Sequence, residues 1–176
     1  RGWIRTHRAG PTGIGKTLED LLGIPENNID GPDFGEYELK SCRINSNSML
    51  TMFTCSPLPR GSNTLLRLKY GYSSDAYDND EKVLHATLSG DHFSPIANTG
   101  HQLKFTCTDD AIFIESEEGI ENIYWTKTDL KRQFENKYKN KFVYAKANSR
   151  GFGADEEFLF LDAWEVSGFN YYSFID

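Results

Sequence analysis

Two carboxylates and a lysine lie close together in one short stretch of the sequence: Asp33, Glu38 and Lys40. Carboxylate oxygens are the ligands that a hard divalent cation such as Mg²⁺ prefers. A bound cation makes a water nucleophilic, and a nearby ammonium holds that water and offsets developing charge. These residue types supply what hydrolysis of a phosphate ester needs. We expect Asp33 and Glu38 to bind the cation and Lys40 to serve as the ammonium.

The spacing of these residues sets a condition on the backbone. Glu38 and Lys40 are two positions apart, so on an extended strand they lie on one face. Asp33 and Glu38 are five apart and would lie on opposite faces of an unbroken strand. We therefore expect a bend within residues 34–36, where Gly35 tolerates the dihedral angles of a hairpin tip or bulge. Taken alone, the motif fits an ordinary ion pair on a solvated strand equally well.

Several segments of the sequence resemble one known family, and they occur in the same order as in that family. These segments are residues 13–22, 32–34, 38–40, 50–54 and 59–64. The sequence is similar here to the MvaI/BcnI restriction endonucleases, in the MutH-like branch of the PD-(D/E)xK nucleases. The resemblance is densest over residues 3–71 and weaker at residues 84–90 and 123–125. It implies the restriction-endonuclease-like fold, a central mixed sheet flanked by helices.

The resemblance also implies a function. It implies a Mg²⁺-dependent type II restriction endonuclease, in which Mn²⁺ can substitute, that cleaves double-stranded DNA at a short sequence as a monomer. Asp33 and Glu38 would be the metal ligands and Lys40 the catalytic lysine, with Glu19 as a further acidic residue beside the site. Two alternatives stay open: Glu19 as a plain surface carboxylate, and a nuclease-fold DNA-binding module without turnover.

A second motif lies upstream. Residues 10–17 fit the pattern GxxxxGK(S/T) of nucleotide-binding P-loops. A P-loop follows a buried parallel strand, whereas residues 5–8 are polar, so a P-loop ATPase is the less favoured alternative. The same glycines leading into a helix could instead present N–H groups to a DNA phosphate, together with Lys16 and Thr17. A plain structural turn fits equally well.

Further DNA contacts are expected from polar side chains that follow the motif: Arg43, Arg60, Asn63 and Arg67. Arginine binds phosphates and reads guanine in the major groove. Taken singly, each arginine fits an ordinary surface position better. The expectation therefore rests on the set.

Composition limits the class of protein. The chain has 176 residues, enough for one domain with a core, and we treat residues 1–176 as a single nuclease domain, truncated at one or both ends. The net charge of −7 argues against a nucleic-acid binder, but residues 1–70 hold nine Lys/Arg against seven Asp/Glu. A local basic face can therefore still meet phosphate.

The cysteines and the apolar segments indicate the compartment. The three cysteines are widely spaced, which excludes a disulfide framework and a CxxC zinc site. A reducing cytoplasm fits this pattern, and the resemblance to restriction endonucleases implies a bacterial one. No apolar run is long enough to span a membrane, so we expect no membrane partner.

The elements that must position the site follow from periodicity and turn residues. We predict helices at residues 16–23, 63–70 and 128–138, the last with Thr128 as its N-cap. Residues 33–43 should be extended. Strands are predicted at residues 48–55, 82–89, 102–108, 111–116, 121–126, 141–147 and 157–161. Together they predict a mixed α/β or α+β domain with helices packed on a sheet.

Overall fold

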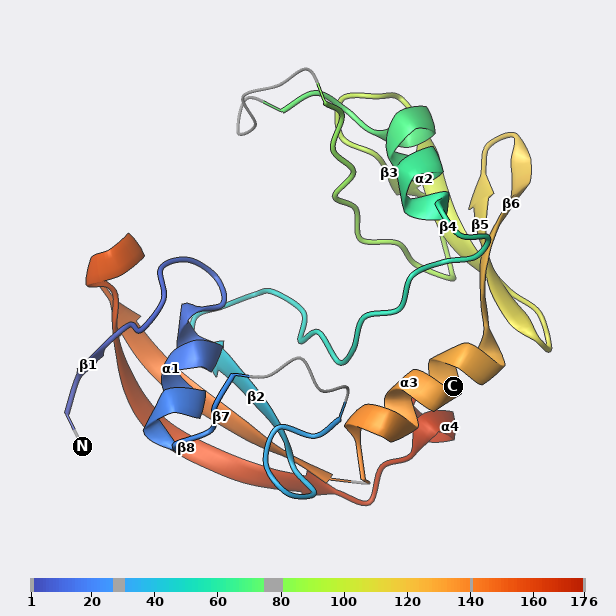
Figure 1. The fold of residues 1–176 in the computed structure, drawn as a ribbon. Helices are drawn as coiled ribbons and strands as arrows, with labels where there is room; N and C mark the ends of the chain where they lie inside the picture. The colour runs from blue at the N-terminus through green and yellow to red at the C-terminus, as the bar shows by residue number, and fades with distance from the viewer. Residues whose placement is uncertain (1, 27–30, 75–80, 140, 176) are drawn as a thin grey trace. The chain divides into compact units, whose positions relative to one another are not determined.

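The computed structural model describes residues 2–26, 31–74, 81–139 and 141–175 (Figure 1). The chain forms two compact units. Unit 1 comprises residues 1–53 and 132–176, and unit 2 comprises residues 54–131. The described residues contain four α-helices and two four-stranded sheets, so the predicted mixed α/β class is confirmed.

Unit 1 is built on a sheet with the strand order β1-β8-β7-β2. The strands are β1 (Ile4–Arg5), β2 (Glu38–Arg43), β7 (Lys141–Arg150) and β8 (Glu157–Ser167). The two long strands, β7 and β8, are antiparallel, while β2 runs parallel to β7. Because β2 is the last strand in this order, the strand that carries Glu38 and Lys40 forms an edge of the sheet.

Helix α1 (Gly13–Leu21) packs on this sheet in unit 1. Its Ile14 is buried together with Ala147 of β7 and Phe158 of β8. Full burial of a side chain as large as Ile14 or Phe158 contributes roughly 1.5–3 kcal/mol. The apolar side of α1 thus fixes the helix that carries Glu19.

An aromatic cluster holds the C-terminal end of α3 (Lys127–Lys137) within unit 1. The ring of Phe134 meets the rings of Phe169 and Tyr171 edge to face, at centroid distances of 5.6 and 6.1 Å. Tyr171 begins α4 (Tyr171–Ile175), which is drawn next to α3 in Figure 1. Phe169 and Tyr171, near the end of the sequence, therefore pack against α3.

Unit 2 packs one helix on an antiparallel sheet. The sheet has the order β3-β4-β5-β6, and its strands are β3 (Ser94–Pro95), β4 (Gln102–Cys107), β5 (Ala111–Ser116) and β6 (Gly119–Thr126). Leu66 and Tyr70 of α2 (Ser62–Tyr70) are buried with Leu103 and Ile114 of the sheet.

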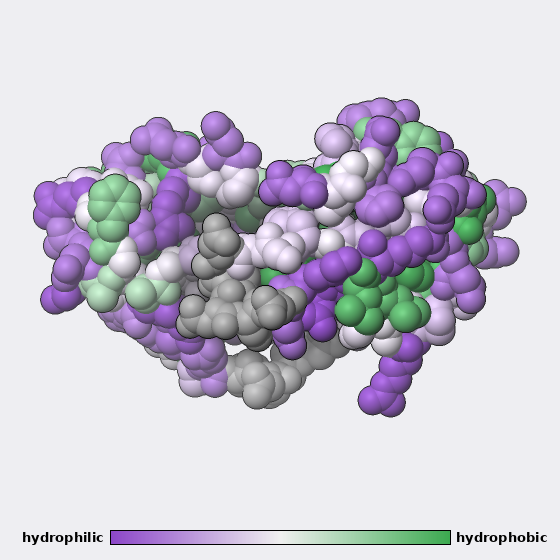
Figure 2. Space-filling view, turned by 90° about the horizontal axis from the view of Figure 1, so that it is seen from above, coloured by the Kyte–Doolittle hydropathy of each residue, from purple (hydrophilic) through white to green (hydrophobic). Residues whose placement is uncertain are grey.

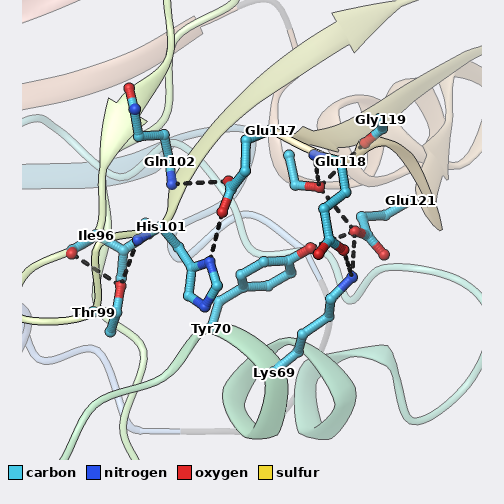
Figure 3. A network of polar contacts seen from close by, with 11 residues as sticks. Lys69, Tyr70, Ile96, Thr99, His101, Gln102, Glu117, Glu118, Gly119 and Glu121 are labelled. Atoms are coloured by element: carbon cyan, nitrogen blue, oxygen red, sulfur yellow. Dashed lines mark hydrogen bonds and ion pairs between the residues drawn. The ribbon is translucent and has the colours of Figure 1, made fainter.

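A polar network ties the end of α2 to the β5–β6 hairpin (Figure 3). The Lys69 ammonium lies 2.8 Å from Oε1 of Glu121 and 3.1 Å from Oε2 of Glu118. The buried hydroxyl of Tyr70 donates to the same Glu121 carboxylate. The contacts around Glu121 therefore give the buried Tyr70 a polar partner and fix the helix end.

Two predicted strands are wrong. Residues 48–55 form no strand, and residues 82–89 contribute only a single bridge, between Val83 and Tyr72. In the first segment, the carbonyl of Met52 accepts a hydrogen bond from the Tyr138 hydroxyl at 2.6 Å. In a strand, this carbonyl would accept a backbone N–H of a neighbouring strand. Phe53 of this segment packs edge to face on Phe134, at a centroid distance of 6.4 Å, without joining a sheet.

The predicted N-cap of α3 is also wrong by two residues. The helix begins at Lys127, and Oγ1 of Thr126 accepts the backbone N–H of Asp129 at 3.0 Å. The Thr126 hydroxyl in turn donates to the Asp129 carboxylate at 2.7 Å. Thr126 thus satisfies a free N–H of the first turn, as an N-cap does.

The surface agrees with the composition. Hydrophilic residues dominate the face drawn in Figure 2. Charged residues make up 26% of the chain, which accounts for this. Among the helices of the described ranges, none combines the length and apolarity needed to cross a bilayer.

Candidate active site

A two-residue hairpin precedes β2. The backbone N–H of Phe34 donates to the carbonyl of Tyr37 at 2.9 Å, and the N–H of Tyr37 donates back to the carbonyl of Phe34 at 2.8 Å. Gly35, at the first of the two tip positions, has φ of 59°, a conformation that costs glycine little. The bend predicted within residues 34–36 is confirmed.

The hairpin brings Asp33 back onto β2. Oδ2 of Asp33 accepts the backbone N–H of Leu39 at 2.9 Å, so the carboxylate lies beside the strand that carries Glu38 and Lys40. Burial raises the pKa of Glu38, and the negative charge of Asp33 raises it further. The two carboxylates are therefore close enough for their charges to interact.

The two oxygens of the Glu38 carboxylate differ in their hydrogen bonds. Its side chain is 2% exposed, and Oε1 accepts hydrogen bonds from Lys40 at 2.9 Å and from Lys137 at 3.3 Å. Oε2 is buried and has no hydrogen-bond partner among the described residues. The hydrogen bond and the charge of Lys40 lower the pKa of Glu38, but the effect of burial is larger. The pKa of Glu38 is therefore raised overall. Glu38 and Lys40 share one face of β2, as their spacing predicts.

These donors fit a divalent cation. Within the described ranges no group of three or more His, Cys, Asp or Glu side chains forms a metal cluster. Mg²⁺ does not need one, because it keeps several waters and binds one or two carboxylates together with substrate phosphates. Buried polar atoms normally have a partner, and a cation held by Asp33 and Glu38 would give Oε2 its partner.

Glu19 lies near Asp33. Burial raises the pKa of Glu19, and the charge of Asp33 adds to that effect. Glu19 lies on α1, and its side chain is half-buried at the wall of the cleft. The structure thus brings Glu19 close to Asp33, and both residues line the same cleft.

The site opens into a cleft of about 600 Å³ within unit 1. Glu19, Asp33, Lys40 and Lys137 all line it. A volume of this size is typical of a ligand site. The walls come from α1, the loops around β2, and the end of α3, so three separate parts of unit 1 line the cleft next to Asp33.

Sequence reasoning missed two residues of this site, Lys137 and Tyr138. Lys137 is 99 residues from Glu38, and no motif spacing connects the two. The Tyr138 ring lies 6.0 Å from the Lys40 ammonium, and burial, together with the charges of Glu38 and Asp33, raises its pKa. A basic and an aromatic residue at the end of a helix carry no specific sequence signal.

The P-loop-like segment has the wrong surroundings for a P-loop. The strand before it, β1, has two residues and pairs antiparallel with β8. A P-loop requires a buried parallel strand at this place. The ATPase alternative is therefore wrong.

The glycine-rich turn packs tightly against its own chain. A Cβ on Gly13 would lie 2.2 Å from the carbonyl oxygen of Arg8. Thr17 is fully buried, and its hydroxyl donates to the Gly13 carbonyl at 2.7 Å. The Lys16 ammonium lies 2.8 Å from Oδ1 of Asp20. This geometry supports the structural-turn interpretation and leaves Thr17 no exposed atoms for DNA.

Arg43 is also occupied inside unit 1. Its guanidinium donates twice to Glu156, at 2.6 and 2.7 Å, and again to the carbonyls of Gly10 and Pro11 at 3.3 and 3.2 Å. Paired contacts of this kind are the strong form of a charged hydrogen bond. Arg43 therefore fastens the glycine-rich turn to the sheet.

The remaining candidate DNA-binding residues belong to unit 2. Arg67 donates to Oε2 of Glu81 at 3.0 Å and to the Lys82 carbonyl at 3.2 Å. Arg60 and Asn63 are exposed at the start of α2. Of this group, these two present the most accessible side chains.

Two solved structures of one restriction endonuclease are similar to this chain. A complex of the restriction endonuclease MvaI with its cognate DNA substrate matches with a TM-score of 0.80 and 31% identity, over 92% of this chain and 67% of that one. The structure of MvaI in the absence of DNA matches with a TM-score of 0.49 and 28% identity, over 97% and 76%. No curated protein gave a match.

A sequence model of the MvaI/BcnI restriction endonuclease family matches residues 1–176. The family match spans the whole chain, and the TM-score of 0.80 to MvaI extends it to the fold. Restriction endonucleases in general depend on a divalent metal ion, which agrees with the donors found at Asp33 and Glu38. The chain therefore belongs to the MvaI/BcnI restriction endonuclease family and is a DNA endonuclease.

Proposed function

We propose that this endonuclease cleaves double-stranded DNA at a short recognition sequence, using Mg²⁺ held by Asp33 and Glu38, with Mn²⁺ able to substitute. The observation that carries the proposal is the buried Oε2 of Glu38, which has no hydrogen-bond partner in the described part of the chain and lies near a second carboxylate. The similarity to MvaI in complex with its cognate DNA supports duplex DNA as the substrate.

Each side chain of the cleft has a defined part in this proposal. The bound cation supplies Lewis acidity at the scissile phosphate. Lys40 holds the attacking water and offsets charge that develops on the phosphoryl oxygens. Glu19 accepts a hydrogen bond from water at the same site. The water attacks phosphorus in line, the bond to the 3′ oxygen breaks, and 5′-phosphate and 3′-hydroxyl ends result.

The contacts of the candidate residues narrow the DNA-binding set. Arg60 and Asn63 are exposed and are proposed to contact DNA directly. Lys16 and Arg67 can contribute by exchanging their carboxylate partners for phosphate, because these ion pairs are partly exposed. We assign Thr17 and Arg43 to the scaffold. We further propose a monomer, which cuts the two strands in separate events because it has one acidic pair.

A plasmid-nicking assay with Mg²⁺ or with EDTA tests the proposal. Wild type should nick only with Mg²⁺, and Asp33→Asn and Lys40→Ala should each lose about 10²-fold or more in rate, the scale of a lost electrostatic contact at a reacting centre. Glu36→Gln is the matched control, since Glu36 lies in the same hairpin, is 71% exposed and pairs with Lys141. Equal rates for all four proteins, or nicking in EDTA, would refute the proposed chemistry. DNA binding without cleavage in any metal would indicate a module without turnover.

A further inference from the structure

Lys137 and Lys40 share one acceptor in the cleft. The Lys137 ammonium lies 3.3 Å from Oε1 of Glu38, and the Lys40 ammonium lies 2.9 Å from the same oxygen. The other oxygen, Oε2, receives neither of them. The carboxylate is thus held by one oxygen, while the other is buried without a hydrogen-bond partner among the described residues.

This asymmetry fixes the orientation of the carboxylate. Any rotation of the Glu38 carboxylate other than a half-turn, which only exchanges two equivalent oxygens, would break the contacts to both lysines. The side chain is 2% exposed, so water could not replace these contacts cheaply. While both lysines are in place, Oε2 is the oxygen that remains available to a cation.

The two lysines differ in what holds them. Lys40 is on β2, two residues from Glu38, while Lys137 comes from the end of α3. That end is fastened in unit 1: the hydroxyl of Tyr138 donates to the Met52 carbonyl at 2.6 Å, and its ring meets Phe142 at 5.8 Å. Lys137 therefore approaches Glu38 from a fixed support that is independent of β2.

We propose that Lys137 is a positioning residue for the metal site: it holds Oε1 of Glu38, so that Oε2 stays aimed at the cation when Lys40 turns toward the attacking water. The inference rests on the proposed role of Asp33 and Glu38 as metal ligands. Groups that orient metal ligands in this way typically change metal affinity or activity by 10–100-fold when they are removed.

The test measures Mn²⁺ binding to the whole chain without DNA, by calorimetry or by the spectroscopic signal of free Mn²⁺. Lys137→Met keeps the length of the side chain without its charge and should weaken Mn²⁺ binding by roughly 10-fold or more. Lys137→Arg should recover most of the affinity, because a guanidinium can donate to the same oxygen. Lys139→Met is the matched control: Lys139 is exposed, and among the described residues it donates to the Glu135 carbonyl alone, at 3.3 Å.

The outcomes separate this inference from the proposed function. Unchanged or tighter Mn²⁺ binding by Lys137→Met would overturn the positioning role, provided that Asp33→Asn still abolishes binding. If Asp33→Asn binds Mn²⁺ as wild type does, the metal site itself fails, and the role of Lys137 falls with it. Thermal unfolding of each variant identifies a loss caused by misfolding. Weakened binding at an unchanged unfolding midpoint, with recovery in Lys137→Arg, supports the proposal.

Discussion

The backbone N–H of Leu39 donates to Oδ2 of Asp33 at 2.9 Å, across the hairpin that separates the two residues in sequence. Because Asp33 enters the hairpin and Leu39 leaves it, this contact places the first carboxylate beside the strand of the second. Residues 34–37 form the hairpin, so Asp33 and Glu38 do not lie on one continuous strand. The rule that residues five apart face opposite sides of a strand therefore does not apply to them.

Gly35→Ala should weaken the hairpin. The φ of 59° at Gly35 costs an L side chain about 1–2 kcal/mol, although no atom lies within 4 Å of the added Cβ. The free energy of unfolding in urea should fall by about that amount, and Mg²⁺-dependent nicking should fall with it. Gly31→Ala is the control, because its Cβ also meets nothing within 4 Å and its φ is not positive. If Gly35→Ala and Gly31→Ala lost equal amounts of stability and nicking activity, the bend at Gly35 would not be what positions the site.

Arg43→Ala should act on stability, and Arg60→Ala on DNA binding. Removing Arg43 leaves Glu156 as a nearly buried charge without its bidentate partner, which costs about 3 kcal/mol. The exposed Arg60 should change the free energy of unfolding by less than about 0.5 kcal/mol while weakening DNA binding measured in Ca²⁺. If Arg43→Ala were as stable as wild type but bound DNA weakly, Arg43 would be a DNA-binding residue and its structural role would be contradicted.

Tyr138→Phe should loosen one wall of the cleft. The substitution keeps the buried ring but removes the hydrogen bond to the Met52 carbonyl, a loss of about 1 kcal/mol. Urea unfolding should show this change, and residues 49–51 should exchange their amide hydrogens faster. Tyr172→Phe, at a ring that is 60% exposed, serves as the comparison. No difference between the two variants would show that the contact with Met52 does not hold the wall.

Unit 2 should lose stability in acid through Glu117. The hydrogen bond from His101 at 2.6 Å, with backbone N–H groups, lowers the pKa of Glu117 from 4.5 to about 2. A carboxylate with a lowered pKa stabilises the folded state above its ordinary pKa, and that contribution is lost as the pH falls toward 2. Wild type should therefore exceed Glu117→Gln in thermal stability at pH 5, and the difference should shrink steadily toward pH 2.

The control for this titration is the same substitution in a His101→Asn background. There the largest cause of the lowered pKa is gone, so Glu117→Gln should change stability by less at pH 5. A difference that is constant from pH 5 to pH 2 would show that the contact between His101 and Glu117 contributes no pH-dependent stability.

Local relationships in this chain were predictable, and distant ones were not. The spacing of Asp33, Glu38 and Lys40 predicts the bend and the shared face, because both depend on a few consecutive residues. Lys137 comes 99 residues after Glu38, so its contact depends on where α3 packs. An arginine near the motif can be a DNA ligand or a structural residue, and only the folded position of its partner decides between them.

The same limit explains the false strand at residues 48–55. Its apolar run fits a buried strand, but strand formation needs a neighbouring backbone, and Tyr138 takes the Met52 carbonyl instead. The helix over residues 62–70 and the strand over residues 111–116 agree closely with prediction, because their periodicity and turn residues are local.

The central claim is that Asp33 and Glu38 bind one divalent cation next to Lys40. The most direct measurement is anomalous diffraction from crystals grown with Mn²⁺. The account predicts a single strong peak with oxygens of Asp33 and Oε2 of Glu38 each about 2.0–2.5 Å away. Crystals that show no peak between these carboxylates, with their oxygens turned apart, would contradict it.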